Sequence, residues 1–216
     1  MKSLLVNSSA DISPTAGQMP RLLGLAYASH FYKVNTALHQ GKFLNYSNKG
    51  NEVAFGTIGD ASTSEGLFWE AINAAGVLQV PMLMSVWDDG HGISVPKKYQ
   101  TTKESISEIL KGFQRENGGN GYEIFKTKGW DYAHLCETYE KAAKVCREQH
   151  VPVLVHVEEV TQPQGHSTSG SHERYKSKER LQWEIDFDCV KKMREFIIQN
   201  ALADEATLNA IEEDAK

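Results

Sequence analysis

Three acidic side chains come directly after two short apolar runs, at positions where carboxylates could bind a metal ion. Asp60 follows the run VAFGTIG, and Asp88 and Asp89 follow the run MLMSVW. If the two runs are neighbouring parallel strands, these acids meet at the carboxyl edge of the sheet, where such folds bind ligands. Carboxylate oxygens suit Mg²⁺, and the turn at 61–65 opens a helix whose free N–H groups favour a phosphate. The pattern indicates a metal–diphosphate site, although acids after strands serve more often as solvated caps and turn formers.

The segments that would position these acids alternate between helix and strand. Apolar residues at helical spacing predict helices, and short apolar runs bounded by Gly or Pro predict strands. Such alternation is typical of an α/β protein with a mostly parallel sheet and helices on both faces. The expected elements are helices at 19–38, 65–78 and 131–148, a helix opening at 101–104, and strands at 53–59, 82–87, 122–127 and 153–157.

A polar segment at 161–178, TQPQGHSTSGSHERYKSK, interrupts this alternation. It is too long for a simple connection, and long polar loops are more often functional or mobile than structural. Two further helices are expected, at 181–200 and 204–216. We therefore divide the chain into an α/β core at 1–160, a loop at 161–178 and a helical C-terminal extension at 179–216. This extension is expected to be truncated, because its last helix is still amphipathic where the sequence stops.

The composition excludes several classes of protein. The chain has 216 residues, 40% of them hydrophobic, and a net charge of −5, which predicts a packed domain with no affinity for nucleic acid or anionic membranes. No apolar run approaches the ~20 residues that a membrane span needs, so no membrane association is expected. The three cysteines are widely spaced, which fits neither a disulfide framework nor a zinc site. We expect a reducing compartment and a cytoplasmic location.

The stretch at 59–96, GDASTSEGLFWEAINAAGVLQVPMLMSVWDDGHGISVP, resembles the thiamine-diphosphate motif of the α subunit of 2-oxo acid dehydrogenases. That family reads Gly-Asp-Gly, 26 residues, then Asn-Asn; here Gly-Asp-Ala is followed by 26 residues and Asp-Asp. SPTAGQMP at 13–20 is similar to the family segment that touches the aminopyrimidine ring, and GHSTSG at 165–170 is similar to its histidine-containing active-site loop. These three matches cover nearly the whole chain in the right order, and they imply the thiamine-diphosphate-binding fold.

For the metal, the resemblance implies Mg²⁺ bound by the side chains of Asp60 and Asp89 and by the backbone carbonyl of His91. Asp88 and Asp89 depart from the family's Asn-Asn pair. A carboxylate remains a good Mg²⁺ ligand, but it adds negative charge beside a diphosphate. Weaker cofactor binding is therefore expected unless a nearby cation compensates.

For thiamine diphosphate itself, the resemblance implies a site that begins at Gly59. Ala61 and Ser62 would offer backbone groups to the diphosphate, and Thr15 would meet the aminopyrimidine through its backbone carbonyl. Ala61 replaces the second Gly of the family motif, and its methyl group is tolerable only where the local φ is negative.

For the reaction, the resemblance places His166 near the reactive carbon of the cofactor, where it would act catalytically and help to pass the acyl group to lipoamide. Ser167 lies where some family members carry a regulatory phosphoserine. Gln162 stands where we place an Arg in the family, so no phosphate or carboxylate contact can be carried over to that position.

Other candidate residues have simpler interpretations. The pair Lys97-Lys98 is expected to face solvent, and its alternative role is to neutralise the extra acid at the site. The remaining histidines are expected on the surface or in satisfied core sites; they include His30, His39, His134, His150, His156 and His172.

The resemblance implies the decarboxylating component of a 2-oxo acid dehydrogenase, in which a 2-oxo acid loses CO₂ and the acyl group moves to a lipoyl arm. The motif wording is closer to branched-chain than to pyruvate members, and acetoin dehydrogenase and a cofactor-free binding module stay open. The family's activating glutamate lies in a β-type half that this sequence lacks. We therefore expect a fragment, inactive alone, whose partners are the β-type half, in the same or a separate chain, and a lipoyl-bearing acyltransferase. The full-length protein is expected to be an oligomer.

Overall fold

The computed structural model describes residues 12–166 and 172–216. Its centre is a four-stranded sheet in which all three strand pairs are parallel, in the order β1-β2-β6-β5. A two-stranded antiparallel sheet, β3 with β4, follows β2. This arrangement confirms the α/β fold with a parallel sheet. The strands are β1 (Ala54–Gly59), β2 (Met82–Trp87), β3 (His91–Gly92), β4 (Val95–Pro96), β5 (Glu123–Lys128) and β6 (Val153–Glu158).

Helices surround the sheet and continue beyond it. The α-helices are α1 (Gln18–Val34), α2 (Gly66–Leu78), α3 (Ile106–Ile109), α4 (Tyr132–Gln149), α5 (His172–Tyr175), α6 (Lys178–Asp186), α7 (Cys189–Gln199) and α8 (Glu205–Asp214). Short 3₁₀ helices are η1 (Thr36–Leu38), η2 (Gly41–Asn45), η3 (Ala61–Ser64), η4 (Lys97–Tyr99), η5 (Thr102–Glu104) and η6 (Leu110–Phe113). None of the helices in the described ranges combines the length and the apolar composition that crossing a membrane would need.

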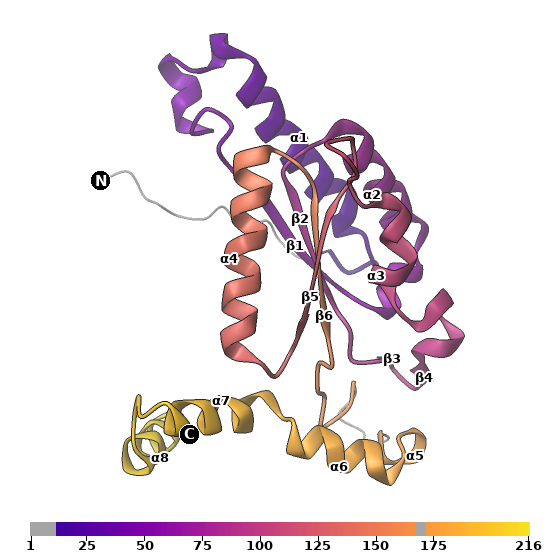
Figure 1. Ribbon diagram of the computed structural model, residues 1–216, viewed down its shortest axis with the longest axis vertical. Helices are drawn as coiled ribbons and strands as arrows, with labels where there is room; N and C mark the ends of the chain where they lie inside the picture. Colours follow the sequence, from indigo (N-terminus) through magenta and orange to yellow (C-terminus); the bar gives the residue numbers. More distant parts are fainter. Residues whose placement is uncertain (1–11, 167–171) are drawn as a thin grey trace.

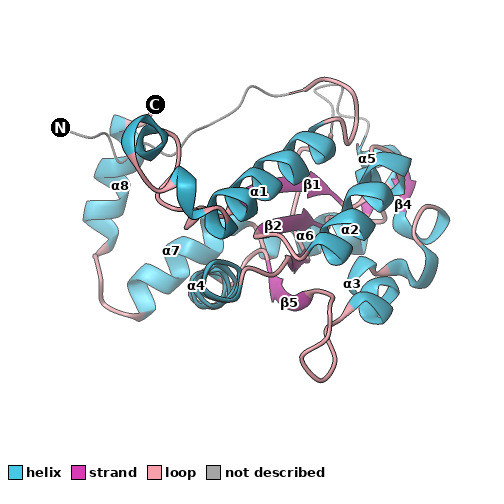
Figure 2. Cartoon of the chain, turned by 90° about the horizontal axis from the view of Figure 1, so that it is seen from above, coloured by secondary structure: helices cyan, strands magenta, loops and turns pink. Residues whose placement is uncertain are grey.

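The sheet separates two hydrophobic clusters, one on each face (Figure 1). Alternate residues of a strand point to opposite faces, and β2 shows this clearly. Met82, Met84 and Val86 face α1, α2 and α3 in the larger cluster, whereas Leu83 faces α4 in the smaller one. Figure 2 shows the same division from above, with α2 on one side of the strands and α4 on the other. Helices on both faces are therefore confirmed.

Two expected helices are shorter than their apolar spacing predicts. The first ends at Val34 rather than at 38, because Asn35 adopts an extended backbone and its side chain accepts the N–H of Ala37 to begin η1. The expected helix at 181–200 is interrupted, because the Asp188 side chain accepts two backbone N–H groups and caps a new helix, α7. Local capping prevails over apolar periodicity in both places.

The segment after Thr101 is also less helical than predicted. Lys103 and Glu104 both have positive φ, so η5 ends there and α3 begins separately at Ile106. Non-Gly residues rarely take this conformation. Within the polar segment at 161–178, α5 forms and α6 begins at Lys178.

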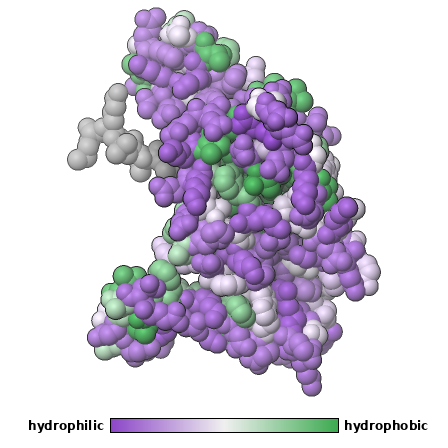
Figure 3. All heavy atoms as spheres, viewed as in Figure 1, coloured by the Kyte–Doolittle hydropathy of each residue, from purple (hydrophilic) through white to green (hydrophobic). Residues whose placement is uncertain are grey.

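The C-terminal helices lie at the carboxyl end of the sheet, below the strands in Figure 1. Helices α5 and α6 lie near β3 and β4, and the pair α7–α8 extends to one side. Figure 3 shows apolar side chains exposed over this pair at the lower left. Val190, Leu202 and Ile211 are all more than half exposed.

Candidate functional site

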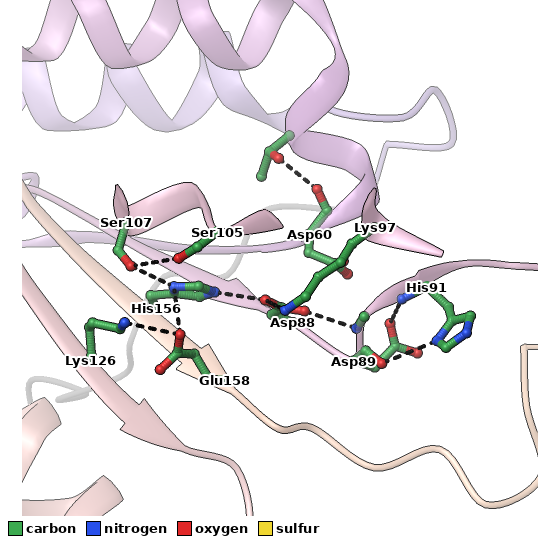
Figure 4. A network of polar contacts seen from close by, with 12 residues as sticks. Asp60, Asp88, Asp89, His91, Lys97, Ser105, Ser107, Lys126, His156 and Glu158 are labelled. Carbon is green, nitrogen blue, oxygen red and sulfur yellow. Dashed lines mark hydrogen bonds and ion pairs between the residues drawn. The ribbon is translucent and has the colours of Figure 1, made fainter. Parts of the chain in front are cut away.

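The acids singled out in the sequence follow neighbouring strands. Strands β1 and β2 pair in parallel with Gly59 opposite Trp87, and the Asp60 N–H donates to the Trp87 carbonyl at 3.0 Å. Asp60 therefore leaves the sheet beside the loop that carries Asp88 and Asp89. All three side chains are more than 90% buried, and Figure 4 shows them at the ends of their strands.

A cavity of about 690 Å³ opens at this edge of the sheet. The structure brings every residue that the sequence assigned to the site to its wall, although these residues come from four separate segments of the chain. Which of their atoms bind a ligand stays a prediction. The predicted residues that line the cavity are Thr15, Gly59, Asp60, Ala61, Ser62, Asp89, His91 and His166.

Asp60 is held in surroundings that disfavour its charged form. Burial raises the pKa of this carboxyl first, and the negative charges of Asp88 and Asp89 raise it further, from its usual 3.8 to about 7. Its Oδ2 atom is buried and has no hydrogen-bond partner among the described residues. Such a group carries a free-energy penalty that a bound cation would remove.

Two more buried oxygens in the cavity wall resemble Asp60 Oδ2. Asp89 Oδ1 accepts the His91 N–H at 3.1 Å, but Asp89 Oδ2 accepts no hydrogen bond from any residue that the structure describes. His166 Nε2 lies 3.3 Å from this oxygen without the alignment of a hydrogen bond. Gln162 Oε1 is likewise unpartnered within the described ranges. These three oxygens belong to residues that line one cavity. Carboxylate and amide oxygens are the ligands that a hard cation such as Mg²⁺ prefers.

The protein side chains alone do not complete a metal site. In the described part of the chain, no three side chains of the types His, Cys, Asp or Glu gather where they could bind one ion. An ion at Asp60 and Asp89 would need further oxygens from the backbone, from Gln162 or from a ligand. Mg²⁺ commonly binds in this way, with few carboxylates and with the phosphates of a substrate.

Asp88 plays a different part from Asp89. Its Oδ2 accepts from Lys97 Nζ at 2.9 Å and lies 3.0 Å from His156 Nε2, and its Oδ1 accepts the Gly90 N–H at 2.9 Å (Figure 4). Burial raises the pKa of Asp88, but the hydrogen bonds from His156 and Lys97 outweigh it, so the pKa is lowered. Asp88 is therefore a charged structural residue that fixes the start of the loop.

This network corrects the expectation for Lys97. Its side chain is only 32% exposed and pairs with Asp88, so it does not simply face solvent. The alternative role, compensation of extra acid, is the better description, but the acid compensated is Asp88 and not the proposed ligand Asp89. Lys98 is exposed, as expected.

His156 supports the Asp88 loop, although no functional role was predicted for it. It is fully buried on β6, with Nδ1 2.9 Å from Ser107 Oγ and Nε2 beside Asp88. This contact set agrees with a satisfied core histidine, and it also anchors the Asp88 loop. A signal was present in the sequence, because a histidine inside the apolar run VLVHV must find polar partners.

Ala61 fits the site despite replacing a glycine. It lies in η3 and is not among the residues with positive φ, so the condition for tolerating its methyl group is met. The absence of a side chain at Gly92 leaves room for the Ala61 methyl group. A Cβ atom added at Gly92 would lie 2.8 Å from the Ala61 Cβ and 2.5 Å from Gln100 Nε2.

Several cavity residues were not predicted. Gln18 lines the wall and donates from Nε2 to the Thr57 carbonyl at 3.1 Å, and Trp87 is half exposed there. Gln18 lies in the segment at 13–20 for which a contact with the aminopyrimidine was expected, whereas nothing in the sequence pointed to Trp87. Ser167, where a regulatory phosphoserine was expected, lies outside the described residues.

The fold and the cavity together define an α/β protein whose ligand site lies at the carboxyl edge of a parallel sheet, with two acidic side chains at the ends of adjacent strands. The sequence matches the family described as "Dehydrogenase E1 component" over residues 8–216. The chain belongs to this family, which confirms the resemblance to 2-oxo acid dehydrogenase α subunits.

Individual relatives are distant. The chain is 25% identical over 174 residues to the pyruvate dehydrogenase E1 component subunit alpha of Rickettsia bellii, covering 81% of this chain and 51% of that protein. The match to the same subunit of Rickettsia prowazekii has the same identity and coverage. It is also 25% identical over 194 residues to the mitochondrial 2-oxoisovalerate dehydrogenase subunit alpha of Dictyostelium discoideum, covering 89% of this chain and 38% of that protein. The chain thus spans about half, or less, of the length of these curated relatives.

Proposed function

We propose that this chain is the part of a 2-oxo acid dehydrogenase that binds thiamine diphosphate and Mg²⁺. The complete protein would carry out oxidative decarboxylation of a 2-oxo acid with acyl transfer to lipoamide. The observation that carries the proposal is the set of unpaired buried oxygens on Asp60, Asp89 and Gln162 around one cavity. They line it at the edge of the sheet where the family motif begins.

We assign tasks to the predicted residues of the cavity wall. Asp60 and Asp89 would bind Mg²⁺ with their side chains and His91 with its carbonyl, while Ala61 and Ser62 would offer backbone groups to the diphosphate. The cofactor, when bound, supplies the carbanion chemistry, and the protein supplies orientation and electrostatics.

Two more residues would act nearer the reacting atoms. Thr15 would orient the aminopyrimidine through its carbonyl, from the exposed turn before α1. His166 would assist acyl transfer to lipoamide. Its side chain is 26% exposed on the cavity wall, so both the cavity and solvent can reach it.

For the substrate we propose a branched-chain 2-oxo acid, with pyruvate and acetoin dehydrogenase as alternatives. The residues of the segments SPTAGQMP and HSTSG resemble those of branched-chain members more than those of pyruvate members, which supports the first assignment. The relatives carry both pyruvate and 2-oxoisovalerate in their names at equal identity, so they favour neither.

For partners we propose a β-type half and a lipoyl-bearing acyltransferase, within an oligomeric full-length protein. Two half-exposed aromatic side chains, Phe55 on the edge strand β1 and Trp87 at the end of β2, support a further protein contact. We also propose a cytoplasmic location, which the three free cysteines support.

The test is calorimetry of the chain together with its β-type half, titrated with thiamine diphosphate in the presence and absence of Mg²⁺. We expect Mg²⁺-dependent binding that Asp60→Asn abolishes and that Asp214→Asn, on the exposed end of α8, leaves unchanged. An absence of binding to the unmodified protein would favour a cofactor-free binding module and overturn the proposal.

A further inference from the structure

A buried cluster of two cations and one carboxylate lies beside the cavity. Lys176 Nζ donates to both carboxylate oxygens of Glu184, at 2.7 and 2.8 Å. Arg180, one turn earlier than Glu184 on α6, donates from Nε to Glu184 Oε1 at 2.8 Å. The side chains of Lys176 and Glu184 are completely buried, and that of Arg180 is 29% exposed. We call these three residues the ion cluster.

The ion cluster also binds the backbone of two different loops. Arg180 Nη2 donates to the carbonyl of Asp89 at 2.7 Å, and Lys176 Nζ donates to the carbonyl of Gln162 at 3.2 Å. Both Asp89 and Gln162 line the cavity. One side of the site thus comes from the loop after β2 and the other from the segment after β6, and the cluster joins the two.

This junction lies between the loop that carries Asp89 and the segment that leads to His166. His166 follows Gln162 by four residues, and its Nε2 lies 3.3 Å from Asp89 Oδ2. Figure 1 shows α5 and α6 at the carboxyl end of the strands, directly after this segment.

Attachment of α6 alone does not require such a cluster. Buried ions lose their hydration, and apolar residues of similar volume often stabilise a fold as well or better. Charged hydrogen bonds instead impose a specific geometry on the groups that they join. The planar guanidinium of Arg180 binds Glu184 with one N–H and Asp89 with another, a geometry that a lysine ammonium reproduces poorly.

We propose that Lys176, Glu184 and Arg180 are positioning residues that hold the proposed metal-binding loop and the segment leading to His166 in a fixed relative placement. Helix α6 is then a structural part of the cofactor site rather than an appendage. The identity of the ligand rests on the proposed function, whereas the junction between the loops can be tested without any ligand.

The first test is hydrogen exchange on the full chain without metal, which compares Arg180→Met with Lys178→Met, an exposed cation on the same helix. The reporter amides are those of Gly90, His91 and Gly165, whose N–H groups are hydrogen-bonded within the two loops. We expect Arg180→Met to speed their exchange by at least about tenfold while amides of β2 and β6 keep their rates. Lys178→Met should change neither set.

A second variant covers the case in which Arg180→Met does not fold. Arg180→Lys keeps a charge beside Glu184 but lacks the planar fork, so the same loop amides should exchange faster at nearly unchanged global stability. Unchanged loop amides, or uniform acceleration throughout the chain, would show that the cluster only attaches α6 and would overturn the inference.

The second test is binding of thiamine diphosphate with Mg²⁺ in the presence of the β-type half. Arg180→Met should weaken binding about tenfold, or by about 1.4 kcal/mol, and Lys178→Met should not. Wild-type affinity in Arg180→Met would overturn the positioning role. If the unmodified protein does not bind, the proposed function fails, and the exchange experiment still decides whether the cluster joins the loops.

Discussion

Asp60 is buried with two like charges nearby, and its proton is correspondingly hard to remove. Ionisation of this carboxyl is therefore unfavourable in the metal-free protein, and a cation bound as proposed would remove the penalty.

Asp60→Asn should therefore stabilise the metal-free protein at neutral and higher pH. The folded-state pKa of Asp60 is about 7 and the unfolded value is 3.8, so the unfolded chain releases its proton first and stability falls as pH rises between these values. The gain has a ceiling of about 4 kcal/mol above pH ~7 and vanishes near pH ~4, where both states are protonated.

Urea unfolding midpoints of the two proteins across this pH range provide the measurement. Asp214→Asn, at an exposed position, is the control. Equal midpoints for Asp60→Asn and the unmodified protein at pH ~8 would show that the carboxylate is better solvated than its burial indicates.

Lys97 is the second residue with a specific expectation. Lys97→Met leaves the buried Asp88 with His156 and one backbone N–H as partners. We expect a loss of about 1–3 kcal/mol, because one partner of a largely buried charge is removed while Lys97 itself is partly exposed. Lys98→Met next to it is the matched control and should change stability little; equal effects of the two would contradict the role of the pair.

At the residue scale, the sequence predicted residues that line the cavity but not the residues that hold the Asp88 loop in place. The position of Asp60 and Asp89 follows from strand ends and motif spacing, which are local features. The partners of Asp88 are Lys97, nine residues later, and His156, 68 residues later. Only the sheet order β1-β2-β6-β5 brings His156 next to Asp88, and no local pattern encodes that order.

Among the elements, the four strands of the main sheet were predicted nearly to the residue and the helix ends were not. Strand β2 matches its expected range, because a buried parallel strand is a continuous apolar run between turn residues. Helices were predicted too long where a polar side chain offers a competing cap, as at Asn35 and Asp188.

Asp188 supplies a test of that explanation. Its carboxylate accepts the N–H groups of Val190 and Lys191 at 3.0 and 3.1 Å. Asp188→Ala should cost about 1 kcal/mol of stability, and Asp188→Asn should retain most of it, because Asn is an equally good N-cap. Thermal unfolding of the three proteins makes the comparison; a loss of stability in Asp188→Asn equal to that in Asp188→Ala would argue that charge rather than capping matters.

For the molecule as a whole, stability is concentrated in the sheet. Its two hydrophobic clusters pack against α1 to α4, whereas α7 and α8, within described residues 172–216, contain no buried residue. Arg194 joins α7 to α8 through Glu205 and Glu212, but ion pairs at exposed positions contribute little.

Amides of α7 and α8 should consequently exchange much faster than those of β2 and β6. We expect a difference of about two orders of magnitude or more in protection, measured by hydrogen exchange of peptides from the two regions. Equal protection would show that the helical pair unfolds only together with the sheet.

The contact between Ala61 and Gly92 has a consequence for the history of this sequence. The methyl group at 61, together with the Gln100 side chain, occupies the space that a side chain at 92 would need, so a larger residue at 92 would clash with both. A sequence with alanine at the first site is therefore expected to favour glycine at the second, 31 positions later. Such a coupling between distant positions should appear as paired substitutions wherever related sequences diverge.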